Sequence, residues 1–269
     1  MSYNLLKGKK GIIFGALNVD SIAWKVALKA HEEGAEFILT NAPVALRMGE
    51  LDELAKATGS DVVPADVTSI EDLENLFSKA AEKFGKIDFI LHSIGMSINV
   101  RKKIPYTESN YDFFAKGLDI SAISFHKVMK IAKEKDIMNE WGSIVALSYI
   151  AAQLAIPGYN DMSDAKSLLE SIARTFGYYY GLDKKVRVNT ISQSPTKTTA
   201  GNGIKGFDSL YNFSNDNSPL GNAPSDACAD YCITLFSDLT KYVTMQNLFH
   251  DGGFSKTAVT DKVINKFLE

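Results

Sequence analysis

The sequence has few cysteines, no strong excess of charge and no long apolar run. Cys228 and Cys232 stand four residues apart with no histidine near them in the sequence, so they cannot complete a zinc site and are expected to be buried thiols. A net charge of -3 at pH 7 argues against a nucleic-acid or polybasic membrane partner. The first residues lack an apolar signal core, and no apolar run is long enough for a membrane span. We therefore expect a cytoplasmic protein without a metal site.

Seven short apolar or β-branched runs alternate with longer segments of helical period. We expect strands at 11–14, 36–40, 61–65, 87–92, 143–148, 186–191 and 245–250. Helices are expected at 22–33, 46–57, 70–84, 108–136, 160–181 and 225–236. Strands that alternate with helices specify a parallel sheet covered on both faces. The sequence therefore predicts an α/β protein, a single Rossmann-type domain over 1–269 with a doubly wound, seven-stranded parallel sheet.

Residues 198–222 depart from that alternation. The segment is rich in Gly, Asn, Ser and Asp, which resist regular structure, at a place where this architecture needs only a short connection. We predict a flexible substrate-binding lid here, and an ordered surface excursion is the alternative.

The first predicted strand leads through Gly15 and Ser21 into a helix, without the usual G-x-G-x-x-G pattern. A strand, a glycine turn and a helix N-terminus present backbone N–H groups and a positive dipole end to a pyrophosphate. Taken alone the motif is modest, because a glycine followed by a serine N-cap is also an ordinary turn.

Two later strand ends strengthen the dinucleotide interpretation, since ligands of open α/β sheets bind beyond the carboxyl ends of strands. Asp66-Val67 follows the third predicted strand, where the carboxylate can accept from an adenine amino group, although an N-cap of the next helix is the alternative. Ser93-Ile94-Gly95 follows the fourth, where glycine lets the backbone pass close to a ribose.

The choice of cofactor is weakly determined by the second predicted strand. That strand ends at Leu39-Thr40-Asn41 without the acid that commonly binds an adenosine ribose, and without a basic pair for a 2'-phosphate. The missing basic pair favours NADH, with NADPH as the alternative. His92, just before the fourth strand end, is expected to be half-buried with its hydrogen bonds satisfied.

The most informative residues are Tyr149, Tyr159 and Lys166. Tyr159 and Lys166 differ by seven residues, nearly two helical turns, so both are expected to project from one helix face, with Tyr149 at the preceding strand end. Hydride addition to an enoyl thioester creates an enolate, which needs a donor such as a phenol and a positive potential such as a lysine supplies. A carbonyl reductase of this fold places the lysine four residues after the tyrosine, where Ser163 stands here. A chance pair on a helix is the alternative.

Nearly the whole sequence, from Gly8 to Phe254, resembles the divergent short-chain dehydrogenase/reductases that comprise bacterial NADH-dependent enoyl-acyl-carrier-protein reductases. The most specific elements are the two tyrosines with the lysine, the stretch His92-Ser93-Ile94-Gly95, and Gly15 followed by Ser21-Ile22-Ala23.

The resemblance implies a role for each matched residue. Tyr159 would donate to the enolate oxygen, Lys166 would bind the cofactor ribose, Tyr149 would assist in the substrate pocket and Ser97 would contact the substrate. The implied cofactor contacts are Gly15, Ser21, Ile22, Asp66, Val67, Ser93, Ile94, Gly95 and Lys166, with Thr196, Lys197, Thr198, Thr199 and Ala200 covering the nicotinamide and pyrophosphate. An acyl carrier protein bearing the enoyl thioester is the implied partner, in the elongation cycle of type II fatty acid biosynthesis, and a homotetramer the implied assembly.

Two stretches depart from the family pattern. Gln193-Ser194-Pro195 stands where the family typically has Ala-Gly-Pro, which places a larger polar group near the nicotinamide and can alter lid mobility. After Lys205 the chain has an acid, Asp208, where the family often has basic residues for the acidic carrier, so Lys197 and Lys205 are the remaining docking candidates.

Two other functions stay open at this point. A carbonyl-reducing dehydrogenase of the same fold is one, because a fold does not determine the substrate. A non-catalytic dinucleotide sensor is the other, motivated by the altered Gln193-Ser194 stretch.

Overall fold

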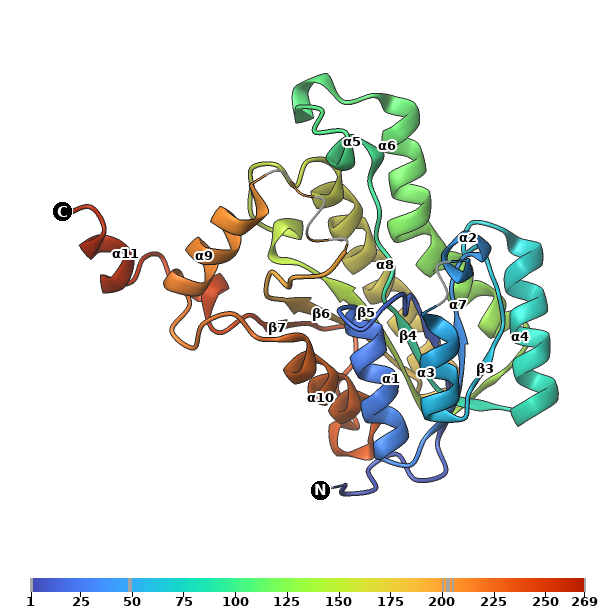
Figure 1. The fold of residues 1–269 in the computed structure, drawn as a ribbon. Coiled ribbons are helices and arrows are strands. Elements are labelled where there is room, and N and C mark those ends of the chain that lie inside the picture. The colour runs from blue at the N-terminus through green and yellow to red at the C-terminus, as the bar shows by residue number, and fades with distance from the viewer. Residues whose placement is uncertain (1, 48–49, 200, 202–203, 205, 269) are drawn as a thin grey trace.

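The computed structural model describes residues 2–47, 50–199, 201, 204 and 206–268, and its centre is one parallel sheet (Figure 1). The seven strands follow the order β3-β2-β1-β4-β5-β6-β7, so the chain winds outward in one direction up to β3 and in the other from β4. This confirms the predicted doubly wound α/β fold. The winding reverses between β1 and β4, and such a switch point leaves a crevice at the carboxyl ends of the two strands.

The strands match the expected runs to within two residues at each end, except for β3 and β5. Their bounds are β1 (Lys10–Phe14), β2 (Glu36–Thr40), β3 (Asp61–Val62), β4 (Ile87–His92), β5 (Met138–Ser148), β6 (Arg187–Gln193) and β7 (Asn247–His250). β3 is shorter than expected. β5 begins five residues early because the chain pairs first at Met138, turns through Trp141 at φ 63° and pairs again from Ser143. Hydrophobic periodicity cannot show such an irregularity.

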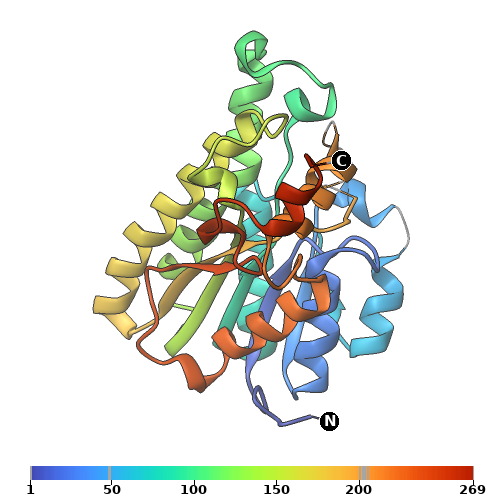
Figure 2. The same ribbon diagram turned by 90° about the vertical axis from the view of Figure 1, so that its left-hand side faces the viewer.

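The helices cover both faces of the sheet, as Figure 2 shows from the side. Their bounds are α1 (Ile22–Glu32), α2 (Pro43–Leu46), α3 (Leu51–Thr58), α4 (Ile70–Phe84), α5 (Ile98–Arg101), α6 (Tyr111–Leu118), α7 (Ser124–Glu134), α8 (Asp161–Lys184), α9 (Phe207–Asn217), α10 (Ser225–Phe236) and α11 (Asp261–Asn265). The helix expected at 108–136 is α6 and α7, joined by a π-helical turn at Asp119–Ile123. The helix expected at 46–57 is divided between α2 and α3, with residues 48–49 outside the described residues.

The core has two halves, one on each face of the sheet. Ile12 of β1 packs in the half formed with α4, α7 and α8, and its neighbour Ile13 packs with α1, α3 and α10 on the other face. Because successive strand residues face opposite sides, a sheet buried on both faces needs continuous apolar strands. Cys228 and Cys232 are fully buried on the α10 side, as expected of core thiols.

The segment 198–222 contains a regular element, so the expectation that its composition would resist helix is wrong. Helix α9 ends at Asn217, whose side-chain oxygen accepts from Thr260 N (3.1 Å) while its amide donates to Thr257 O (3.3 Å). The hydroxyl of Thr260 donates to Asp216 O (2.7 Å). A C-terminal segment forty or more residues away therefore satisfies the end of this helix, and local composition carries no sign of it.

No helix within the described ranges is both long and apolar enough to cross a lipid bilayer.

Candidate active site

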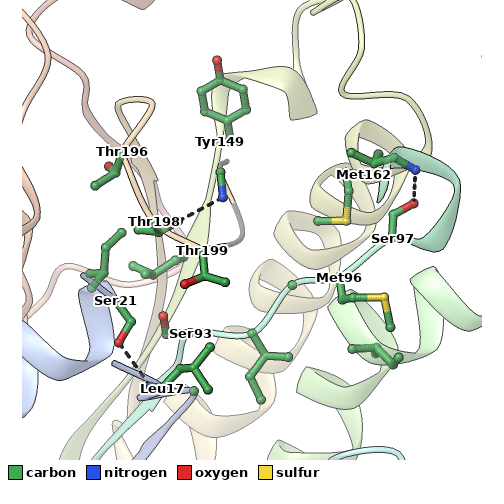
Figure 3. A pocket seen from close by; sticks show the side chains of 18 of the residues that line it. Leu17, Ser21, Ser93, Met96, Ser97, Tyr149, Met162, Thr196, Thr198 and Thr199 are labelled. Carbon is green, nitrogen blue, oxygen red and sulfur yellow. Dashed lines mark hydrogen bonds between the residues drawn. The ribbon is translucent and has the colours of Figure 1, made fainter. Parts of the chain in front are cut away.

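A pocket of about 610 Å³ lies at the switch point between β1 and β4. Its walls are the turn after β1, the loops that follow β2, β3 and β4, the end of β5, the start of α8 and the segment from β6 to α9. Figure 3 shows these groups facing one space, with Ser21 and Leu17 on one side and Met96, Ser97 and Met162 on another. One pocket thus contains both the strand ends expected to bind the cofactor and the residues expected to act in catalysis.

The turn after β1 passes very close to the end of β4. Gly15 has φ +94°, and a Cβ on it would lie 2.1 Å from Ser93 O, so no other residue fits without movement of the backbone. The hydroxyl of Ser21 donates to Asn18 O (2.7 Å) and accepts from Leu17 N (3.2 Å). Ser21 therefore shapes the turn and does not cap α1, which leaves the first N–H groups of α1 free for an anionic ligand.

Gly15→Ala is expected to destabilise the fold by about 1–3 kcal/mol and to weaken NADH binding. The new methyl group would collide with Ser93 O and force the turn away from the pocket. Thermal melting and NADH titration check this. Gly8→Ala is the matched control, because Gly8 also has positive φ (+75°) but open space within 4 Å. Equal effects of the two variants would contradict the explanation by close approach.

Asp66 borders the pocket, and one of its carboxylate oxygens is already hydrogen-bonded within the chain. Its Oδ1 accepts from the amide (2.9 Å) and the hydroxyl (2.7 Å) of Thr68. The N-cap of α4 is Ser69, which accepts from Asp72 N, so the alternative reading of Asp66 as that cap is wrong. Val67 next to it is 6% exposed and also lines the pocket. Contact with an adenine stays a prediction for this pair.

Gly95 leaves room beside the lysine of the site. A Cβ at this position would lie 3.3 Å from Met162 Cε and 3.6 Å from Lys166 Nζ. His92, three residues earlier, is fully buried and binds Ser124 through Nε2 (2.9 Å), while its Nδ1 has no partner among the described residues. The expectation of a half-buried, fully satisfied histidine is therefore wrong. Burial lowers the pKa of His92 to about 3, so the ring is neutral.

Tyr159 does not lie on the helix that carries Lys166, which corrects the prediction that both project from one helix face. Helix α8 begins at Asp161, and Asn160 before it has φ 47° and ψ -132°, outside the helical region. Both side chains nevertheless line the same pocket. The sharp backbone turn at Asn160 therefore brings the Tyr159 phenol to the pocket that Lys166 lines. A helical spacing of seven residues is not the cause.

Lys166 is buried in the second turn of α8, and only 6% of it is exposed. Its ammonium donates to Leu147 O at 2.7 Å, which directs the side chain toward the end of β5. Burial lowers the pKa of Lys166 to about 8, opposed by the nearby carboxylate of Glu170. Lys166 is therefore mostly a cation near neutral pH and loses its charge under mildly alkaline conditions.

The two tyrosines form a contact pair. Their ring centres lie 4.9 Å apart at an interplanar angle of 58°. Burial raises the pKa of both phenols, so both stay protonated and act as donors at neutral pH. Tyr149 directly follows β5, as expected, and Figure 3 shows its ring pointing away from Ser21 and Leu17. Its hydroxyl is buried without a partner in the described part of the chain.

A buried polar cluster, which the sequence analysis missed, supports one wall of the pocket. Asp161 accepts from the hydroxyl of Ser97 (2.6 Å) and from the side-chain amide of Asn99 (2.9 Å). Ser97 also accepts from Val100 N (3.0 Å) and so caps α5. The hydroxyl of Ser97 is thus already bonded, and its contact with a substrate stays a prediction. The only signal in the sequence was an acid at a helix start.

The segment after β6 crosses toward the turn after β1. Thr196, Thr198 and Thr199 line the pocket, and Asn18 Nδ2 donates to Thr199 Oγ1 at 3.0 Å. The ammonium of Lys197 lies 4.7 Å from the centre of the Tyr211 ring, so the structure directs it toward α9 and away from the pocket lining. Ala200 and Lys205 lie outside the described residues.

These features together define a class of protein. A glycine turn and a free helix N-terminus face a protonated phenol and a buried lysine across one pocket at a Rossmann switch point. This combination characterises a dinucleotide-dependent oxidoreductase of the short-chain dehydrogenase/reductase type.

Comparison with known proteins gives the family. Residues 15–255 match the family described as Enoyl-(Acyl carrier protein) reductase, and the chain belongs to it. "Enoyl-[acyl-carrier-protein] reductase [NADH] 1" of Rhizobium meliloti is 36% identical over 252 residues, which are 93% of this chain and 91% of that protein. "Enoyl-[acyl-carrier-protein] reductase [NADH] FabI" of Bacillus subtilis is 33% identical, over 94% of this chain and 98% of that protein.

Solved structures agree with this assignment. The FabI–NADH complex from Alistipes finegoldii is 64% identical, has a TM-score of 0.96 and covers 97% of this chain, which covers 92% of that one. The enoyl-[acyl-carrier-protein] reductase (NADH) of Aquifex aeolicus is 33% identical, with a TM-score of 0.89 and a coverage of 95% of this chain and 100% of that one. The predicted resemblance is therefore confirmed.

Proposed function

We propose that this chain is an NADH-dependent enoyl-acyl-carrier-protein reductase, which saturates the double bond of trans-2-enoyl thioesters in the elongation cycle of type II fatty acid synthesis. The observation that carries the proposal is the shared pocket of Tyr159 and Lys166, facing the Gly15 turn at the switch point. Tyr159 offers a hydroxyl without a partner among the described residues, and Lys166 offers a positive charge.

Tyr159 and Lys166 have different roles in the proposed reaction. Bound NADH supplies the hydride that is added to the β-carbon of the enoyl thioester. The negative charge then develops on the thioester oxygen, and the protonated Tyr159 donates a hydrogen bond to it until the α-carbon takes up a proton. The ammonium of Lys166 makes the local potential positive and has N–H groups for ribose hydroxyls. Tyr149 packs against the ring of Tyr159 and limits the directions in which its hydroxyl points.

The pocket fits a dinucleotide in shape and in its donors. The Gly15 turn is a cradle that a Cβ would fill, and the start of α1 offers N–H groups to the pyrophosphate. At the end of β2, Asn41 binds Ala16 O and Ala42 N with its own side chain, each at 2.8 Å. The side-chain amide of Asn41 thus binds the backbone and offers no positive charge to a ribose 2'-phosphate. This supports NADH as the cofactor, with NADPH as the alternative.

A single assay tests the proposal. The loss of NADH absorbance on addition of a crotonyl thioester is the expected result, with weaker activity when NADPH replaces NADH. Turnover of a 3-ketoacyl thioester without turnover of the enoyl substrate would instead establish the carbonyl-reducing alternative. Tight NADH binding without turnover of either thioester would establish the sensor.

The partner and assembly are part of the same proposal. We infer an acyl carrier protein as the bearer of the substrate, a homotetramer as the assembly and the cytoplasm as the location. Tyr178, Tyr179 and Leu182 of α8 are 54%, 56% and 71% exposed, which supports a contact between subunits on that helix. Analytical ultracentrifugation showing a monomer at micromolar concentration would contradict the tetramer.

A further inference from the structure

The two residues at the end of β6 hold a single residue thirty positions later. Gln193 Nε2 donates to Ala223 O at 2.8 Å, and Ser194 Oγ accepts from Ala223 N at 3.0 Å. The backbone N–H and C=O of Ala223 are therefore both bound by side chains. In a sheet, the backbone of a neighbouring strand would bind these groups. Gln193 and Ser194 are each 4% exposed, so water competes little for these bonds. We call this arrangement the Ala223 clamp.

The orientation of the Gln193 amide is determined by its neighbours. Ala223 O only accepts, so Nε2 must face it, and Oε1 then accepts from His250 Nδ1 at 2.6 Å. The ring of His250 stacks on Tyr231 with centres 5.2 Å apart, and Ser194 N donates to His250 O at 3.1 Å. The clamp is thus attached to β7 and α10, which do not belong to the pocket.

The same residues also hold the start of the segment that lines the pocket. Thr196 Oγ1 donates to Ser194 O (2.9 Å) and lies 3.5 Å from Gln193 Nε2. Three residues further on, Thr199 accepts from Asn18 in the turn after β1. Residues 196–199 are therefore a strap, tied at one end to the Ala223 clamp and at the other to the dinucleotide turn. Figure 3 shows Thr196, Thr198 and Thr199 lying between Tyr149 and Ser21.

We propose that Gln193 and Ser194 are positioning residues for the cofactor, which hold the strap over the dinucleotide end of the pocket by clamping Ala223. The inference rests on the proposed NADH dependence. An alanine or a glycine at either position would have no side-chain group that can bind Ala223. Ordering a segment before the ligand binds lowers the entropy cost of binding, so the clamp is expected to act on NADH affinity and little on the chemical step.

Three single variants separate the contacts of the clamp. Ser194→Ala removes the acceptor for Ala223 N, and Gln193→Ala removes the donor to Ala223 O. Gln193→Glu keeps an acceptor for His250 but has no donor for Ala223. Ser194→Ala and Gln193→Glu each lose one hydrogen bond to Ala223, and we expect each to raise the Kd and KM for NADH by roughly three- to tenfold and to change kcat by less than about twofold. Gln193→Ala also loses the bond to His250, so it should raise the Kd and KM at least as much. The double alanine variant should raise the Kd by less than the product of the single effects, because both side chains hold one residue.

Ser192→Ala is the matched control. Ser192 also lies near the end of β6, is fully buried, and its hydroxyl has no partner in the described part of the chain. It should bind NADH like the wild type. Hydrogen exchange at residues 194–199 without NADH gives a readout that needs no turnover, and it should be faster in Ser194→Ala and Gln193→Ala than in Ser192→Ala.

The proposal is overturned if folded Ser194→Ala keeps wild-type NADH affinity and exchange rates, or if Gln193→Glu behaves like the wild type. The first result would show that the strap does not need Ala223, and the second that the bond to His250 is the one that matters. Ser194→Ala removes only one oxygen atom, so it keeps the test available if a glutamine variant does not fold. Failure of the proposed function is seen separately, as a wild type that binds NADH but does not reduce an enoyl thioester.

Discussion

Tyr159→Phe is expected to lower kcat by roughly 10²–10³-fold on a crotonyl thioester, while the KM for NADH stays within about twofold. The phenylalanine keeps the ring contact with Tyr149 but removes the hydroxyl that would stabilise the enolate oxygen. Because the pKa of Tyr159 is raised by burial, the lost group is a neutral donor, so the variant should be equally impaired across neutral pH. Steady-state kinetics over that range is the measurement.

Two tyrosine variants make this result specific. Tyr178→Phe changes a half-exposed ring on the outer part of α8 and should keep wild-type rates. Tyr149→Phe removes a buried hydroxyl without a partner in the described residues, so its effect on kcat should be much smaller than that of Tyr159→Phe. Full activity in Tyr159→Phe would refute its role as the donor, and a larger loss in Tyr149→Phe would transfer that role to Tyr149.

Lys166→Ala is expected to reduce kcat/KM by roughly 100-fold or more, through both a higher KM for NADH and a lower kcat. The variant loses the cation, the donor for ribose hydroxyls and the bond to Leu147 O together.

The pKa of Lys166 also leads us to expect an alkaline limit to the activity of the wild-type enzyme. Its pKa is lowered from 10.5 to about 8 by burial, so the catalytic cation is lost as the pH rises through about 8, and activity should fall there.

The sign for stability is opposite to that for activity. An unfolded chain keeps the Lys166 proton up to about pH 10.5, whereas the folded chain releases it near 8, so the unfolded state binds more protons in between. This group should therefore increase the free energy of unfolding as the pH rises from 8 to 10.5.

Lys166→Arg is the matched variant for the alkaline limit of activity. Arginine stays charged throughout this pH range, so any activity that the variant keeps should lack the limit. An unchanged limit near pH 8 in Lys166→Arg would assign it to another group.

The elements of the fold were predictable where their cause is local. The apolar runs of β1, β2 and β4 and the helical period of α4 were each recognised within one or two residues, because burial on both sheet faces requires those patterns. Gly15 was likewise identified as part of a turn. The reason that only glycine fits there was not accessible, since Ser93 O belongs to a strand end nearly eighty residues later.

In the site, too, the sequence indicated the residue types but not the contacts that place them. Tyr149, Tyr159 and Lys166 line one pocket, and their catalytic roles stay predictions. The helical argument for the proximity of Tyr159 and Lys166 was wrong, because Asn160 has a non-helical backbone conformation that residue spacing does not show. The buried cluster around Asp161 was missed, since its partners Ser97 and Asn99 lie at the start of α5, more than sixty residues earlier in the chain.

The order of apolar and polar residues along the chain was thus enough to predict a doubly wound parallel sheet, with its ligand at the carboxyl ends of the strands. Contacts between distant segments, with Thr260 and with Ala223, determined the end of helix α9 and the attachment of the strap, and a local turn at Asn160 placed the phenol in the pocket. The physical reason is that hydrophobic period acts over one element at a time, whereas a buried hydrogen bond depends on whichever group the folded chain brings within 3 Å of it.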